Sequence, residues 1–276
     1  MDSENRWIGD SASGLFVRHS FCRLFLFSIL LVALSAAFAE PVPARLQQGS
    51  GHIFLEILDE NGKILAAGES LQTVKDDIVS ARTTFHFRDG SLDDETTVFD
   101  QRVHLRVLTD DHLQRGPAFP HPMEIRIDAE AGRVTVHDLE SDKTTSHDLK
   151  IPFDLANGIV TQILQNLSPD TAETKVSYVL PVATPRLATL VISRAGEDTY
   201  TLSGDRQTAK KLEIKIDLGG LAGFMAPILG KQPKPSYAWM AGGSVPMFIR
   251  IQTQFYEGAA LWTIRQTAPK WSTEEK

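Results

Sequence analysis

The chain has 276 residues, of which 42% are hydrophobic and 23% are charged. This composition is typical of a folded globular protein and excludes the disordered, collagen-like and coiled-coil classes. The 28 Lys and Arg residues against 35 Asp and Glu residues give a formal net charge of -7, which argues against a nucleic-acid-binding surface. The single cysteine, Cys22, excludes a disulfide framework and a metal site built from cysteines.

The N-terminal segment predicts export. An uncharged apolar run of 16 residues, Leu24–Ala39, follows Arg18 and Arg23 and ends in Ala37-Phe38-Ala39. A positive stretch, an apolar run and an A-x-A sequence are the three parts of a secretory signal peptide. Residues 1–39 are therefore predicted to be removed, which leaves a periplasmic or secreted protein. The alternative is a retained anchor, although the apolar run is shorter than the roughly 20 residues that span a bilayer.

The chain after the leader alternates between apolar and polar residues, as β-strands do. Residues 40–51 contain two prolines together with Gln, Gly and Ser, and they predict a flexible tether. Residues 52–271 are expected to form one domain of about ten to twelve strands, followed by a polar tail, 272–276. Turn signals such as Asn61-Gly62 and Asp89-Gly90 separate the strands.

One segment, Asp154–Leu167, departs from the period of two. Its apolar residues recur at helical spacing: Leu155, Ile159, Val160, Ile163, Leu164 and Leu167. Asp154 is the expected N-cap, and Pro152 and Pro169 bound the segment. The expected fold class is therefore α+β and rich in β-structure, with one large curved antiparallel sheet of the half-barrel type wrapped on one principal amphipathic helix. A closed two-layer sandwich is the second choice.

The C-terminal third carries a recurring strand pattern, which comprises Leu212–Leu218, Tyr237-Ala238-Trp239, Gly243, Pro246–Ile251 and Gly258–Ile264. Together with the leader, the long meander and the helix, this pattern resembles the half-barrel architecture of periplasmic lipoprotein carriers. The segments FRDGSLDDETTVF and GPAFPHPMEI resemble a closer group of exported bacterial envelope proteins of unknown function. The resemblance implies an apolar cavity under the half-barrel and carries no catalytic motif.

Catalytic and metal-binding motifs are absent from the sequence. It contains no G-x-S-x-G elbow, no H-E-x-x-H motif, no P-loop and no G-x-G-x-x-G motif. His86 and His104 are expected on the polar faces of two paired strands, with His112 and His121 in nearby loops, which indicates surface histidines rather than zinc ligands. The acidic run Asp89–Glu95 lacks the spacing of an EF-hand and is expected to be a solvated hairpin loop. No catalytic residue, metal or cofactor is predicted.

The uncharged segment Leu218–Gly230 contains four glycines and several large apolar residues. It is expected to be a buried plug that closes one end of the sheet, and the alternatives are a lid over an apolar cavity and a membrane-touching loop. In the lid interpretation the ligand-binding residues are Leu221, Phe224, Met225, Ile228 and, on a neighbouring strand, Trp239.

Three functions remain open on this basis. The first is a carrier or binding protein of the bacterial envelope that holds an apolar or amphiphilic small molecule or a lipid, with possible peripheral membrane contact and no nucleic acid. The second is a hydrolase with a carboxylate or histidine site that one sequence does not reveal. The third is a structural module that docks another envelope protein through a sheet edge. The sequence favours the first and a protein without enzymatic activity.

Overall fold

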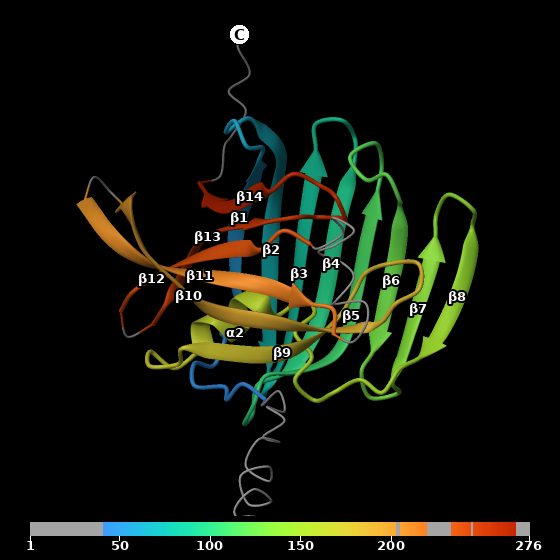
Figure 1. The fold of residues 1–276 in the computed structure, drawn as a ribbon, viewed down its shortest axis with the longest axis horizontal. Helices are drawn as coiled ribbons and strands as arrows, with labels where there is room; N and C mark the ends of the chain where they lie inside the picture. Colours follow the sequence, from blue (N-terminus) through green and yellow to red (C-terminus); the bar gives the residue numbers. More distant parts are fainter. Residues whose placement is uncertain (1–40, 203–204, 220–232, 244, 269–276) are drawn as a thin grey trace, which may run out of the picture. The chain divides into compact units, whose positions relative to one another are not determined.

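Fourteen strands of the computed structural model form one antiparallel sheet (Figure 1). The structure describes residues 41–202, 205–219, 233–243 and 245–268, and all statements below concern these residues. A single short helix, α2 (Val160–Asn166), accompanies the sheet in this part of the chain. No helix in the described ranges is both long enough and apolar enough to cross a membrane.

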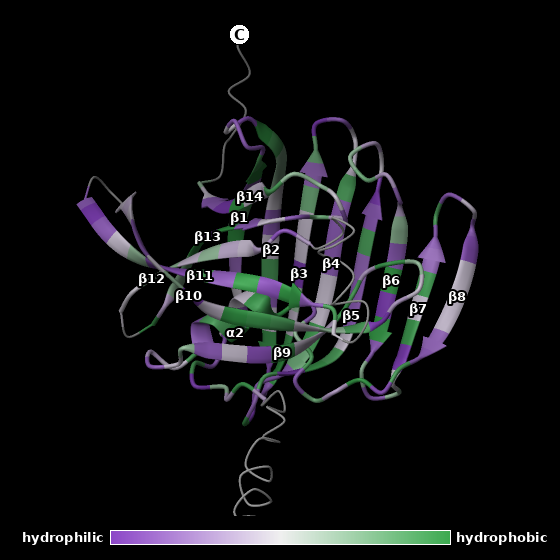
Figure 2. Cartoon of the chain, viewed as in Figure 1, coloured by the Kyte–Doolittle hydropathy of each residue, from purple (hydrophilic) through white to green (hydrophobic). Residues whose placement is uncertain are grey.

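The first half of the sheet is a meander of eight strands in chain order. They are β1 (Gly51–Leu58), β2 (Ile64–Lys75), β3 (Ile78–Phe87), β4 (Leu92–Asp100), β5 (Arg106–Arg115), β6 (Met123–Asp128), β7 (Arg133–Asp138) and β8 (Lys143–Asp148). Gly62 and Gly90 have φ values of 80° and 90° in the predicted hairpin turns, a conformation that glycine adopts without strain. Figure 2 shows hydrophobic and hydrophilic residues alternating along these strands.

The second half contains six strands. They are β9 (Glu173–Val179), β10 (Leu187–Leu202), β11 (Asp205–Asp217), β12 (Ser236–Ala241), β13 (Met247–Thr253) and β14 (Trp262–Thr267). The last strand pairs with the first, with Ile57 opposite Ile264. This pairing joins the two halves in the order β8 to β1 and then β14 to β9. Strands β8 and β9 form the two edges and do not pair with each other, so the sheet is not closed.

The largest hydrophobic cluster, called the main core below, lies between the two halves. It contains buried residues of β3–β7, of the segment around α2, and of β9–β12. Ile159, Ile163 and Leu164 of the predicted helical stripe are buried in it. The sheet face that carries Phe99 and Ile192 is called the inner face, because both halves direct this face toward the main core. The large antiparallel sheet and its single helix confirm the predicted fold class in outline.

The helix is shorter than predicted, because it begins at Val160 rather than at Asp154. Gly158 has a φ of 68°, which interrupts helical geometry. The preceding residues run beside β9 instead, and the N–H of Ala156 donates to the carbonyl of Ser177 at 2.8 Å. Asp154 is not an N-cap, since its carboxylate accepts a hydrogen bond from the N–H of Ser177 at 3.0 Å. A tertiary contact with the edge strand therefore replaces the first helical turn.

The described part of the predicted tether, residues 41–51, contacts the domain and leads into β1. Val42 is buried in the main core. The N–H of Leu46 donates to the side-chain oxygen of Asn166 at 2.7 Å, and the N–H of Gln48 donates to Gln101 at 2.6 Å. Buried Asn and Gln side chains of the domain thus hold this segment, which differs from the expectation of a flexible linker.

Candidate functional site

Polar side chains cross the inner face between two hydrophobic clusters. The second cluster, called the aromatic cluster, has six buried members: Leu55, Ile57, Ala66, Phe85, Phe87 and Phe119. Along β3, Val79 belongs to the main core and Phe85 to the aromatic cluster, with Thr83 between them. Cross-strand pairing aligns Ser70, Thr83, Glu95 and His112 on β2, β3, β4 and β5. These four residues and the adjacent Asp93, Thr97, Asp110 and Gln114 are called the inner polar strip.

His112 and Asp93 form an ion pair within the inner polar strip. The Nε2 atom of His112 lies 3.1 Å from Oδ2 of Asp93, and the two side chains are 19% and 8% exposed. The amide of Gln114 donates to the same carboxylate oxygen at 2.7 Å. Burial acts to lower the pKa of His112, but the charge and hydrogen bond of Asp93 outweigh this effect and raise it to about 10. His112 is therefore a cation at neutral pH.

Two further carboxyl groups of the strip differ in their environment. Asp110 is 2% exposed and accepts a hydrogen bond from the hydroxyl of Thr97 at 2.7 Å. Burial raises the pKa of Asp110 to about 6, while the bond from Thr97 and the charge of His112 act against this rise. Burial and then the charge of Asp110 raise the pKa of Glu95 to about 8. Of the two, Glu95 is the carboxyl group whose protonated form the fold favours more strongly.

Glu95 differs from the other members of the strip in its contacts. No hydrogen bond from the described part of the chain reaches its carboxyl group, although Asp93 and Asp110 both have hydrogen-bond donors. Glu95 is partly exposed on the inner face, beside the partly exposed Ser70 and Thr83. A protonated carboxyl group both donates and accepts hydrogen bonds. Glu95 is thus the group of the strip that remains available to a ligand.

Tyr178 faces the strip from the other half of the sheet. It lies on β9 and packs against the main core. Burial raises the pKa of its phenol, and the charges of Glu95, Asp110 and Asp93 raise it further. The phenol therefore stays protonated and is a second potential donor. The inner polar strip consequently lies within reach of groups from both halves.

Gly158 covers one end of the strip. A Cβ atom added at this position would lie 1.8 Å from the Thr97 hydroxyl oxygen and 2.7 Å from Oδ1 of Asp110. The backbone of the segment before α2 thus closes Asp110 off from any substrate. A hydrolase that acts with a pair of carboxyl groups needs both of them at the scissile bond. The arrangement of Glu95 and Asp110 does not meet this requirement.

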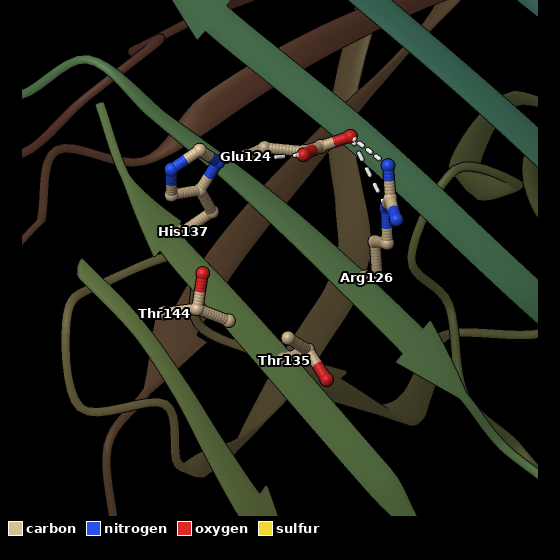
Figure 3. Close-up of a pocket in the computed structure, with 5 residues that line it drawn as sticks. All are labelled: Glu124, Arg126, Thr135, His137 and Thr144. Atoms are coloured by element: carbon tan, nitrogen blue, oxygen red, sulfur yellow. Dashed lines mark hydrogen bonds and ion pairs between the residues drawn. The ribbon is translucent and has the colours of Figure 1, made fainter. Parts of the chain in front are cut away.

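The structure also offers a depression on the outer face of β6–β8, with a volume of about 120 Å³. Figure 3 shows its lining residues, which are Glu124, Arg126, Thr135, His137 and Thr144. Glu124 pairs with Arg126, and His137 lies between Glu124 at 3.9 Å and Asp142 at 2.9 Å. These charges neutralise one another in a shallow, solvated surface. Among the described residues, no group of three or more His, Cys, Asp or Glu side chains is arranged to hold a metal ion.

The residues predicted to bind a ligand are not brought together in the described part of the structure. Leu221, Phe224, Met225 and Ile228 lie outside the described residues. Trp239 is buried on β12, but it belongs to neither hydrophobic cluster. Its indole N–H donates to Oδ2 of Asp198 at 3.1 Å, and the guanidinium of Arg250 lies 4.1 Å from its ring. Charged groups of the outer face therefore surround Trp239.

His104, His112 and the acidic run occupy other positions than predicted, whereas His86 is exposed on β3 and His121 lies outside the strands, as expected. His104 lies outside the strands and forms an isolated bridge with Pro43, so it does not pair with the strand of His86. His112 lies within β5 rather than in a loop. The acidic run is a turn only up to residue 91, because β4 begins at Leu92. Asp93 and Glu95 share the parity of buried Phe99, and this alternation is the signal that places them on the inner face.

Comparison with known proteins gives distant structural similarity only. No protein-family model matches the sequence, and no curated protein sequence matches it. The fold is similar to the crystal structure of a beta-barrel-like protein of Domain of Unknown Function DUF1849 from Brucella abortus, with a TM-score of 0.41 and 8% sequence identity. The alignment covers 83% of this chain and 98% of the other chain. A similarity this low assigns neither a family nor an activity.

Proposed function

We propose that this protein is an exported binding protein that holds a small amphiphilic molecule against the inner face of its open sheet, with the polar group of the ligand at Glu95. The observation that carries the proposal is a partly exposed carboxyl group that receives no hydrogen bond from the described chain and lies between two hydrophobic clusters. Ligand sites are usually apolar surfaces with a few convergent polar groups.

The chemistry of the strip supports a ligand with one polar end. Thr83 lies directly across from Glu95 on the adjacent strand, and its hydroxyl donates to that of Ser70, one strand further, at 2.9 Å. The polar part of the proposed site therefore consists of a protonated carboxyl group and hydroxyl groups, without a second unpaired charge. A hydroxyl, carboxyl or amide group of an amphiphile makes complementary hydrogen bonds there, while its apolar chain covers the adjacent hydrophobic residues.

The leader supports an envelope location. Cleavage after Ala39 releases the chain to the periplasm or the exterior, where an amphiphile needs a carrier because water solvates its apolar part poorly. The uncharged segment Leu218–Gly230, for which the sequence favours a buried plug, covers the ligand or contacts a membrane in the alternative lid interpretation. Intact-mass measurement of the protein from the cell envelope tests export: a chain that begins at Glu40 supports it, and a full-length membrane-bound chain contradicts it.

Ligand binding is tested with purified protein and a fluorescent apolar probe, N-phenyl-1-naphthylamine. Binding should raise the fluorescence of the probe, and decanol should displace it. Glu95→Leu should weaken displacement by decanol about tenfold, because one hydrogen bond to a buried polar group is lost. Glu95→Gln, which keeps donor and acceptor atoms, should retain most of the affinity, as should the control Glu130→Gln in an exposed turn.

Two results would contradict the proposal. One is a protein that binds neither the probe nor any co-purified amphiphile in native mass spectrometry. The other is unchanged displacement by decanol in a folded Glu95→Leu variant, which would remove Glu95 from the site. Circular dichroism of each variant establishes that the fold is intact.

A further inference from the structure

A second depression lies on the outer face of β13 and β14, on the opposite side of the sheet from the inner polar strip. Its volume is about 370 Å³. The lining residues come from both strands and from the β1–β2 turn: Leu58, Asp59, Glu60, Gly62, Arg250, Gln252, Leu261, Thr263 and Arg265. Four of them form a square. In the register of the two strands, Arg250 lies opposite Arg265, and Gln252 lies opposite Thr263.

The opposition of Arg250 and Arg265 is unusual in a sheet. Like charges that lie directly across two strands destabilise the pair. Their side chains are 40% and 50% exposed, so neither is withdrawn from the depression into the core. A bound anion placed between the two guanidinium groups would convert this repulsion into two attractive interactions.

Each arginine is held from its far side by a separate partner. Nε and Nη2 of Arg265 lie 2.8 Å and 2.7 Å from Oε1 of Glu56, whose side chain is only 5% exposed. The guanidinium of Arg250 lies 4.1 Å from the ring centre of Trp239, and its Nη2 atom is 3.4 Å from Asp198. Such contacts reduce the conformational entropy that the side chains lose on binding a ligand.

The other two members of the square add a neutral donor. The amide of Gln252 donates to the hydroxyl oxygen of Thr263 at 3.2 Å. Because this oxygen already accepts a hydrogen bond, the hydroxyl proton of Thr263 is free to be donated into the depression. The square therefore presents two planar cationic donors and one hydroxyl donor to the same volume.

The acidic residues of the depression limit the size of the ligand. Oδ1 of Asp59 accepts hydrogen bonds from the N–H groups of Asn61 and Lys63, both at 2.9 Å, so its charge is committed to its own turn. Glu60 is exposed in the same turn. These negative charges, together with the net charge of -7, oppose the approach of a polyanion such as a nucleic acid.

We infer that the square of Arg250, Gln252, Thr263 and Arg265 is a binding site for one small oxyanion, either a carboxylate or a phosphate ester group. The anion bridges the two guanidinium groups and accepts a hydrogen bond from Thr263. The site is independent of the proposed amphiphile site, since it lies on the other face of the sheet and contains none of the same residues.

The experiment is calorimetric titration of the full mature protein with sodium phosphate, glycerol phosphate and sodium acetate, each against sodium chloride at equal ionic strength. Phosphate, acetate or both should bind in excess of chloride. Arg250→Gln should lower that affinity about tenfold or more, because a charge-assisted hydrogen bond is lost. Thr263→Val should lower it by a smaller factor. The matched control Arg206→Gln, on the exposed part of β11, should bind like the wild type.

Arg250→Gln is preferred to a substitution of Arg265, because Arg265 forms an ion pair with the buried Glu56 and its loss would destabilise the fold. Binding of glycerol phosphate but not acetate identifies a phosphate ester, and the reverse identifies a carboxylate. Equal responses to all four salts, or the same affinity in folded Arg250→Gln, would overturn the inference. Glu95→Leu should leave anion binding unchanged, which separates this test from that of the amphiphile site.

Discussion

At the scale of a single residue, Gly158 allows the segment before α2 to pack closely against the inner polar strip. Its backbone passes so close to Thr97 and Asp110 that a side chain of any size would overlap their oxygen atoms. Its φ of 68° also lies in the left-handed region that disfavours other residues. Glycine is therefore required there for two separate reasons, one steric and one conformational.

Gly158→Ala should lower the free energy of unfolding by about 3 kcal/mol or more, measured by urea denaturation. Left-handed backbone alone costs a non-glycine residue about 1–2 kcal/mol, and the overlap with Thr97 adds to it. Gly62→Ala is the matched control, because Gly62 has a φ of 80° but no atom within 4 Å of the added Cβ. Equal losses in the two variants would contradict a role for the contact with Thr97.

At the scale of an element, side chains from the segment before α2 form hydrogen bonds with backbone groups of the edge strand β9. A free edge exposes N–H and C=O groups that can pair with another chain. Asn157 takes the place of a pairing strand at Val179. Its side-chain amide donates to the Val179 carbonyl at 2.9 Å, and its side-chain oxygen accepts from the Val179 N–H at 2.8 Å. At Ser177 the carboxylate of Asp154 accepts a hydrogen bond from the N–H at 3.0 Å, and the carbonyl accepts one from the N–H of Ala156 at 2.8 Å. This covered edge argues against β9 as the docking edge of a structural module.

Asn157→Ala should destabilise the protein by about 2–4 kcal/mol, since it leaves two buried backbone groups of Val179 without partners. Hydrogen exchange of the Val179 amide should accelerate by more than the global loss of stability accounts for. Asn61→Ala, in an exposed turn, should change the free energy of unfolding by less than about 0.5 kcal/mol. An Asn157→Ala variant as stable as Asn61→Ala would refute the capping role.

At the scale of the whole molecule, the inner polar strip makes folding stability depend on pH. The folded state raises the pKa of Glu95 from 4.5 to about 8 and that of His112 from 6.5 to about 10. The folded protein therefore binds more protons than the unfolded chain in these ranges, so stability falls as pH rises. The contribution of His112 is complete below pH 6.5 and is lost as the pH approaches 10. That of Glu95 is lost between pH 4.5 and 8.

The free energy of unfolding should accordingly decrease by about 3 kcal/mol between pH 6.5 and 8, where both groups act together. Glu95→Gln should show about half this decrease, because only His112 still changes its proton binding in that range. Glu130→Gln should follow the wild type. Urea denaturation at several pH values measures the slopes, and a stability that rises from pH 6.5 to 8 would contradict the protonation states assigned to the strip.

The local sequence alone determined the features that depend on neighbouring residues. Asn61-Gly62 predicted its hairpin because the turn needs a residue with positive φ, which Gly62 supplies at 80°. The spacing of Ile159, Ile163 and Leu164 predicted the buried helical stripe, and alternation predicted the large antiparallel sheet. Each of these signals acts over a few residues, where backbone geometry and hydrophobic period leave few alternatives.

Tertiary structure decided which strands become neighbours and what lies on the inner face. Alternation assigns residues to a face of the sheet but does not specify which strand is the neighbour. The pairing of Ile57 with Ile264 was therefore not predictable from the sequence. Asp93 and Glu95 suggested a solvated loop because charges are rarely buried without partners, and His112, the partner of Asp93, comes from another strand. The first turn of the predicted helix is absent because Asp154 and Ala156 form hydrogen bonds with β9 instead, and because Gly158 has a φ of 68°.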